Sequence, residues 1–155
     1  MKEENAPDVK VIGISMRTRN SDEAVPDTAR IPGLWQQFFS DNIEVNIPSK
    51  VDDGCLYGVY THYDSDHKGE YTIYVGHEVQ NLQSVPAGMN GIEIPAGKYL
   101  VFSQEGQMPG IVYTLWNNIW QFFAESKQYK RAYTLDFERY CKDNASKLDI
   151  FIAIE

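Results

Sequence analysis

The sequence predicts an α+β protein built from two β-α-β-β halves that are duplicated copies of one another. Alternating apolar residues indicate six strands, and two segments with helical spacing stand at corresponding places between them. Short stretches also recur in the same order in both halves, which indicates an internal repeat. We therefore expect halves at about 9–79 and 97–154, related by a pseudo-twofold axis, with a ligand cleft where they meet.

The strands are recognised by their alternation of apolar and polar residues, because alternate side chains of a strand point to opposite faces. They are expected at Val9–Arg17, Cys55–Asp64, Glu70–Val79, Gly97–Gln104, Ala132–Lys142 and Leu148–Ile154. In each half the first strand is followed by a helical segment, and two further strands come after it.

The two helices are predicted from their starts and from their apolar spacing. Ile31–Phe39 carries Pro32 in its first turn, where a proline is tolerated because that backbone N–H has no partner within the helix. Ile111–Glu125 begins after Pro109 and Gly110 and has one apolar face. That face consists of Leu115, Ile119, Phe122 and Phe123.

Three pairs of stretches carry the repeat. They are Leu34–Phe39 with Ile119–Phe123, Val59–Asp64 with Asp136–Cys141, and Tyr71–Val75 with Leu148–Ile152. The segment Gln83–Gly97 is rich in proline and glycine and is predicted to be a linker between the halves. A half of about 75 residues is too small to cover its own sheet, so we expect one domain over residues 1–155.

The charge balance limits the classes of partner. The net charge is −8, with 22 acidic against 14 basic residues, which disfavours direct nucleic-acid binding and suits a cationic ligand or a basic protein partner. The amino-terminal residues lack a hydrophobic signal region and no run approaches membrane-spanning length, so we expect a soluble protein of the cytoplasm with no membrane contact.

Cofactor and metal motifs do not appear in the sequence. We find no glycine-rich phosphate loop, no nucleophile elbow and no triad spacing, and no cysteine and histidine spacing is typical of zinc, so we expect neither cofactor nor metal. Cys55 and Cys141 are separated by 86 residues and do not form a disulfide framework typical of secreted domains. Both are predicted to be free thiols.

Three stretches together resemble the gyrase-inhibitor-like family, which includes effector-binding domains of AraC-type and MerR-type multidrug regulators and stand-alone, integron-cassette-like members. They are Tyr57–Asp64 followed by Gly69–Gly76, then Ile94–Phe102, and then Leu115, Trp116 and Trp120 followed by Asp136–Tyr140. Their order and spacing, rather than any one motif, carry the resemblance, and they span nearly the whole chain.

The resemblance implies a curved antiparallel sheet with two main helices flanking a central cleft. It also implies that the cleft binds small molecules that are often cationic and aromatic. In this family a glutamate on the penultimate strand lies at the bottom of the cleft, and the matching residue here is Glu138.

The strand around Glu138 supports that assignment on chemical grounds. With a period of two, Thr134, Asp136, Glu138 and Tyr140 share one face, and a face with two carboxylates belongs either to solvent or to a polar-bottomed cleft. The resemblance favours the cleft. A carboxylate there is costly to ionise, and a ligand cation that pairs with it, beside aromatic rings, offsets that cost.

The remaining predicted ligand-binding residues come from the helices and from the repeat. In the first half Thr61 takes the place of Glu138, and Tyr63 and Tyr140 share the faces of these two residues. The other predicted ligand-binding residues are Trp35, Trp116, Trp120 and Tyr71. A tryptophan on a helix can equally be a core residue. Tyr60 and Phe137, on the opposite faces, are expected to lie in the core.

The leading interpretation is a stand-alone binding protein for hydrophobic, cationic or amphiphilic small molecules. It would act as a sensor related to transcription regulators, through a protein partner, or by sequestration, because the binding domain leaves no room for a DNA-reading helix-turn-helix. Two alternatives stay open. One is a hydrolase of reactive small molecules with Glu138 and either Tyr140 or Tyr63 as base and acid, and the other is a protein inhibitor of the gyrase type. Whether the protein is an enzyme is left open, with passive binding favoured.

Overall fold

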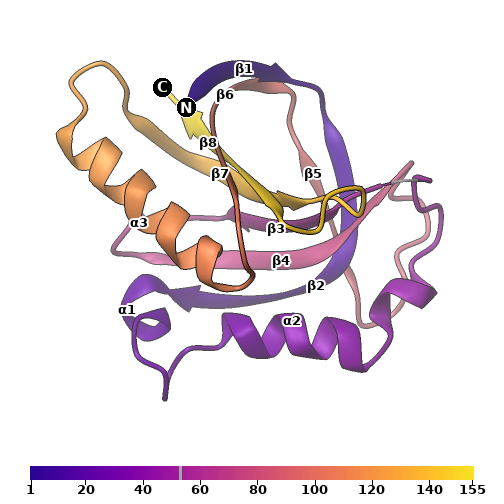
Figure 1. Ribbon diagram of the computed structural model, residues 1–155. Helices are drawn as coiled ribbons and strands as arrows, with labels where there is room; N and C mark the ends of the chain where they lie inside the picture. Colours follow the sequence, from indigo (N-terminus) through magenta and orange to yellow (C-terminus); the bar gives the residue numbers. More distant parts are fainter. Residues whose placement is uncertain (53) are drawn as a thin grey trace.

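The computed structural model describes residues 1–52 and 54–155 (Figure 1). The strands are β1 (Lys2–Ala6), β2 (Val9–Arg19), β3 (Leu56–Thr61), β4 (Glu70–Val79), β5 (Asn90–Ile94), β6 (Gly97–Glu105), β7 (Arg131–Tyr140) and β8 (Lys147–Ile154). The helices are α1 (Asn20–Glu23), α2 (Ile31–Ser40) and α3 (Gly110–Glu125), with a 3-10 turn, η1, at Ile43–Asn46. Over this part of the chain, no helix combines the length and the apolar character needed to cross a membrane.

The strands form one eight-stranded sheet in the order β1-β6-β8-β7-β3-β4-β2-β5, with every neighbouring pair antiparallel. The first half contributes β2-β4-β3 and the second half contributes β6-β8-β7, so the same order runs outward from the central β3–β7 pair. This arrangement confirms the duplicated halves and their pseudo-twofold relation. The outermost strands are exchanged, since β1 pairs with β6 of the second half and β5 pairs with β2 of the first.

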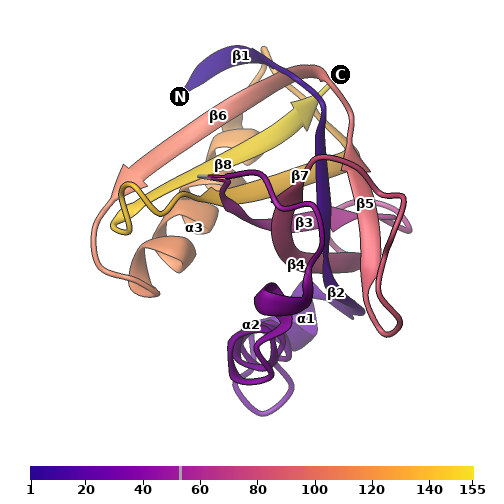
Figure 2. The ribbon, with the colours of Figure 1, turned by 90° about the vertical axis from the view of Figure 1, so that its right-hand side faces the viewer.

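The sheet is strongly curved and carries the two main helices on one face. In Figure 2, β5 and the beginning of β2 run across the direction of β6 and β8. Helix α2 packs on β2 and β4, while α3 packs on β6 (Figure 1). This is the predicted α+β architecture, with one main helix for each half and a cleft between them.

Two apolar clusters occupy the opposite faces of the sheet, as the period of two requires. The helix-bearing face includes Ile12, Ile73, Leu100, Phe102, Leu148 and Ile150, which pack with Leu34, Phe38, Leu115 and Ile119 of the helices. The other face includes Val11, Tyr57, Val59, Tyr99, Phe137 and Phe151. In the described residues both main helices pack on the first face, and the large cavity lies on that face.

The predicted strands all occur, but two edge strands were not predicted. β1 (Lys2–Ala6) has the sequence KEENA, which contains no apolar alternation, and β5 lies inside the predicted linker. Both are held by backbone pairing at the sheet edges, which leaves little trace in the side chains. β3 ends at Thr61, earlier than predicted, because His62 adopts a φ of 50° and turns the chain out of the sheet.

The prediction of free thiols is wrong, since Cys55 and Cys141 form a disulfide with their Cα atoms 4.3 Å apart. The reason is the register of the central pair, in which Leu56 lies opposite Tyr140. Antiparallel pairing therefore places Cys55, which comes directly before β3, opposite Cys141, which comes directly after β7. Their separation in sequence says nothing about this, because β3 and β7 come from different halves.

We expect the disulfide to stabilise the central strand pair. Replacing both cysteines, as Cys55→Ser with Cys141→Ser, should lower the free energy of unfolding by about 2–4 kcal/mol under oxidising conditions. Urea denaturation with and without reductant measures this, with intact mass as a second readout, since the disulfide form is lighter by a pair of hydrogen atoms. A wild-type protein whose mass and unfolding curve do not respond to reductant would contradict the assignment.

Candidate functional site

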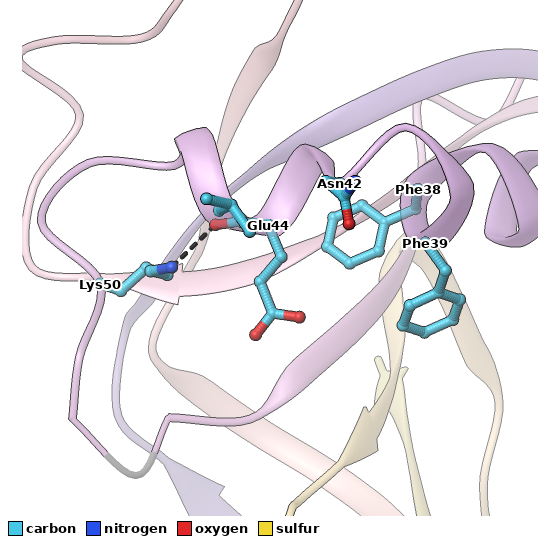
Figure 3. Close-up of a pocket in the computed structure, with 6 residues that line it drawn as sticks. Phe38, Phe39, Asn42, Glu44 and Lys50 are labelled. Carbon is cyan, nitrogen blue, oxygen red and sulfur yellow. Dashed lines mark hydrogen bonds between the residues drawn. The ribbon is translucent and has the colours of Figure 1, made fainter.

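A cavity of about 880 Å³ lies between α2, α3 and the helix-bearing face of the sheet. Its volume falls in the range of small-molecule sites in proteins. A second pocket, of about 210 Å³, lies beside the carboxyl end of α2 and is lined by residues such as Phe38, Glu44 and Lys50 (Figure 3). The larger cavity is the candidate site because it contains a buried carboxylate and most of the predicted aromatic residues.

Glu138 of β7 lies at the base of the large cavity and is only 1% exposed. Its Oε2 accepts hydrogen bonds from Trp116 Nε1 at 2.6 Å and from the Tyr60 hydroxyl at 2.9 Å. Its Oε1 accepts a hydrogen bond from the Tyr140 hydroxyl at 2.8 Å. All three donors are neutral, and within residues 1–52 and 54–155 no cationic side chain forms an ion pair with this carboxylate.

Burial raises the pKa of Glu138, because the charged form loses its hydration. The hydrogen bonds from Trp116, Tyr140 and Tyr60 act in the opposite direction and offset part of that effect. Burial, reinforced by the neighbouring carboxylate, also raises the pKa values of the Tyr60 and Tyr140 hydroxyls well above the usual range. Both tyrosines therefore stay protonated as donors, and the site holds a carboxylate that lacks a counter-charge.

Gly58 makes room for this carboxylate. It lies directly opposite Glu138 in the β3–β7 pair. A Cβ atom at position 58 would approach Glu138 Oε1 to 2.7 Å and the Trp35 ring to 3.4 Å. A glycine inside a strand often marks such a close approach, so the Tyr57–Tyr60 stretch already contained a signal for this residue.

Aromatic side chains form the walls of the cavity. On the sheet, the Tyr60 ring lies 5.5 Å from Tyr71, and Tyr71 lies 5.8 Å from Tyr63. Each main helix carries one pair of aromatic residues one turn apart, with ring centroids 6.0 Å from each other. These pairs are Trp35 with Phe39 on α2 and Trp116 with Trp120 on α3. The second member of each pair is exposed at the rim, so the aromatic surface extends from Glu138 to solvent.

A second carboxylate on the same strand, Asp136, is buried but neutralised. Arg131 Nη2 donates to its Oδ2 at 2.6 Å, the Tyr63 hydroxyl donates to the same oxygen at 2.5 Å, and the Ala153 amide donates to Oδ1 at 2.9 Å. This ion pair fixes Tyr63 at the edge of the cavity. The two carboxylates predicted to share a face therefore differ in their charge compensation. Among the described residues, Asp136 has a cationic partner and Glu138 has none.

The structure brings seven of the eight predicted ligand-binding residues into the lining of one cavity. They are Glu138, Trp35, Trp116, Trp120, Tyr63, Tyr71 and Tyr140. Thr61 is the exception, because its side chain lies on the other face of β3, where its hydroxyl donates to the Thr134 carbonyl. Tyr60, predicted to lie in the core, takes the expected place of Thr61 beside Glu138.

The error at Thr61 is a slip of one residue in the alignment of the halves. Tyr60 pairs with Ile73 and Glu138 pairs with Ile150, and these two isoleucines correspond in the repeat. The counterpart of Glu138 is therefore Tyr60. A shift of one residue moves a side chain to the opposite face of a sheet, which is why Thr61 was misplaced. Tyr63 still reaches the cavity because the turn at His62 breaks the alternation.

Other lining residues were not predicted at all. Arg131 stands at the beginning of β7 and Glu23 stands in the short helix α1. Strict alternation along β7 would place Arg131 on the face opposite Glu138, but the register shift between Arg131 and Asp136 interrupts that alternation, and Arg131 lines the cavity. Glu23 lies in a segment without periodicity, so no sequence signal identified it.

Comparisons with known proteins bear on the family and the fold of this chain. A family described as "Cass2: Integron-associated effector binding protein" matches residues 4–154. The solved structure of an integron cassette protein from the mobile metagenome of Vibrio cholerae is 34% identical, with a TM-score of 0.85 over 99% of this chain and 95% of that chain. The YobU protein of Bacillus subtilis, which carries a transcriptional-regulator name, is 30% identical over 92% of this chain and 90% of its own length.

A more distant solved structure shares the fold alone. The protein SAV2435, bound to tetraphenylphosphonium, is 16% identical, with a TM-score of 0.77 over 99% of this chain and 93% of that chain. Its ligand is a hydrophobic cation. The fold class predicted from the sequence is thus the fold of these proteins.

We predict that Gly58→Ala destabilises the protein by overpacking the site. The added methyl group would meet the Glu138 carboxylate, and overpacking of this kind costs about 1–3 kcal/mol of unfolding free energy. Gly33→Ala is the matched control, because that helical glycine has open space around it and alanine should stabilise α2 slightly. Urea denaturation measures both variants. If Gly58→Ala behaves as Gly33→Ala does, the carboxylate is not held against Gly58.

We also predict that Glu138→Gln stabilises the ligand-free protein at neutral pH. Because folding raises the Glu138 pKa, its contribution to stability is complete below the unfolded-state pKa and is lost as the pH rises through the raised folded value. Glutamine cannot ionise, so the variant should unfold at a higher Tm than the wild type at pH 7, and this difference should shrink as the pH falls toward 4. Thermal unfolding from pH 4 to pH 8 tests this. A less stable variant at pH 7 would mean that the hydrogen bonds of the charged form outweigh its burial.

Proposed function

This chain belongs to the Cass2 family of integron-associated effector binding proteins, and on that premise we propose that it binds hydrophobic cations in the cavity above Glu138. The observation that carries the proposal is the buried Glu138 carboxylate, which has three neutral hydrogen-bond donors and no cationic partner. A bound cation supplies the missing charge.

The free-energy balance favours a cation that is both large and apolar. Pairing with a positive group offsets the cost of keeping Glu138 ionised without water. Trp35, Trp116 and Tyr60 surround that position and present aromatic faces, which attract cations and bury apolar surface. Aromatic walls accept ligands of many shapes, so we expect the charge and hydrophobicity of a ligand to determine its affinity more than its shape does.

We propose that ligand occupancy is read by a partner protein rather than by direct contact of this domain with DNA. The net charge of −8 opposes binding to a phosphate backbone. Relatives named as transcriptional regulators support a role as an effector sensor. The lining comes from both halves of the sheet and from both main helices. A ligand in the cavity would therefore contact both halves and could change their relative position, which a partner protein could detect.

The test compares a cation with a neutral molecule of similar aromatic shape. Glu138→Gln should weaken binding of tetraphenylphosphonium by about 10–100-fold, the order of loss expected for an ion pair in a partly shielded site, and should change binding of triphenylphosphine oxide little. Quenching of tryptophan fluorescence measures both, because tryptophans line the cavity. Wild-type affinity for the cation should fall as Glu138 is protonated at low pH, and the glutamine variant should lack that dependence.

Glu93→Gln serves as the control, because it removes the same charge from an exposed position on β5. Equal losses for the cation and the neutral molecule would show a change in cavity shape, and no loss for either would refute pairing at Glu138. Recovery of intact ligands after incubation separates binding from the hydrolase alternative, which uses Glu138 and Tyr140 as base and acid. An ester or epoxide consumed by the wild type but not by Glu138→Gln would favour that alternative.

A further inference from the structure

The cavity contains a second carboxylate, Glu23, at the end formed by α1 and the beginning of α2. Its oxygens accept hydrogen bonds from the Thr18 hydroxyl at 2.6 Å, from the Arg30 amide at 3.1 Å and from the Ile31 amide at 2.9 Å. These donors are neutral, like those of Glu138. Two of them are the first amides of α2, so Glu23 also satisfies the amino end of that helix.

The charges around the cavity do not cancel. Among the described residues, the lysine and arginine side chains of the lining are already paired, Arg131 with Asp136 at 2.6 Å and Lys142 with Glu44 at 2.8 Å. Glu44 lies outside the large cavity, in the smaller pocket of Figure 3. Neither Glu23 nor Glu138 forms an ion pair in residues 1–52 and 54–155. Two carboxylates thus share one cavity without a counter-charge.

Two tyrosine rings separate these carboxylates. The Tyr60 hydroxyl donates to Glu138, the Tyr60 and Tyr71 rings are 5.5 Å apart, and the Tyr71 hydroxyl donates to Asn20 in the same short helix as Glu23. Burial raises the pKa of Tyr71, and the charges of Glu23 and Glu138 raise it further, so both carboxylates act on this ring. The two carboxylates therefore lie on either side of one pair of tyrosine rings.

We infer that the cavity binds dications, with one positive group at Glu138, the other at Glu23, and an aromatic spacer along Tyr60 and Tyr71. This inference rests on the proposed cation binding at Glu138 and specifies the ligand class further. The Arg30 amide donates to both Glu23 oxygens, so the hydrogen bonds to this carboxylate number four. A quaternary ammonium group has no N–H, so it can pair with Glu23 by charge alone and leave the α2 amides in place. A single cation leaves one of the two carboxylates without a counter-charge.

The test uses a matched pair of rigid probes. The dication is N,N,N,N′,N′,N′-hexamethylbenzidinium, a biphenyl with a trimethylammonium group at each end, and the monocation carries a tert-butyl group in place of one trimethylammonium. Isothermal titration calorimetry on the wild type should show the dication binding about tenfold more tightly than the monocation, the order of gain expected from a second ion pair in a partly shielded site. The preference should shrink as ionic strength rises.

Glu23→Gln should reduce the affinity for the dication about tenfold and leave the monocation unchanged. Glutamine retains an oxygen for the α2 amides, and thermal unfolding checks that the helix is intact. Asp22→Asn is the matched control, because it removes a charge from the neighbouring residue, which does not line the cavity. Glu138→Gln should weaken both probes.

The outcomes separate this inference from the function it rests on. A dication preference that survives Glu23→Gln, or that falls equally in Asp22→Asn, overturns the second subsite while cation binding at Glu138 stands. A wild type that binds both probes equally well also overturns it. Loss of neither probe in Glu138→Gln overturns the proposed function itself.

Discussion

The structure depends on one buried carboxylate held by neutral donors. Glu138 sits where β3 and β7 meet, and its hydrogen bonds tie together β3 through Tyr60, α3 through Trp116 and its own strand through Tyr140. The absence of a side chain at Gly58 leaves the space that the Glu138 carboxylate occupies. These contacts hold a carboxylate away from water at a cost in free energy, and pairing with the proposed cationic ligand would offset that cost.

Duplication explains how such a site arises at a central strand pair. The two halves present equivalent positions on β3 and β7, and these carry Tyr60 in one half and Glu138 in the other. A symmetric pair of glutamates there would place two like charges side by side, whereas the tyrosine donates to the single glutamate. The disulfide at one end of the β3–β7 pair and the Arg131–Asp136 ion pair near the other hold the register on which this contact depends.

The two buried acids of β7 show how context sets the role of a residue type. Asp136 has Arg131 beside it and serves the fold, while Glu138, two residues along the same face, lacks a cation and is available to a ligand. Glu23 combines both roles, because the amides of α2 use its oxygens while its charge stays uncompensated. Charge pairing across the cavity, rather than the number of acidic residues, therefore distinguishes Asp136 from the two carboxylates that we propose as cation sites.

The sequence by itself determined the two-fold repeat, the six inner strands and the two main helices, because hydrophobic periodicity and repeated residues are local properties. The family resemblance identified Glu138 as the central acid, and the strand pattern and the repeat then predicted most of the aromatic lining. Tertiary structure alone decided the rest: the one-residue register that makes Tyr60 and not Thr61 the partner of Glu138, the turn at His62 that brings in Tyr63, and the pairing of Cys55 with Cys141. These features arise only when distant parts of the chain meet. This holds for the register between strands of different halves, and also for the charge balance of a cavity lined by six or more separate segments. The edge strands, held by backbone hydrogen bonds, leave no side-chain pattern for a sequence to reveal.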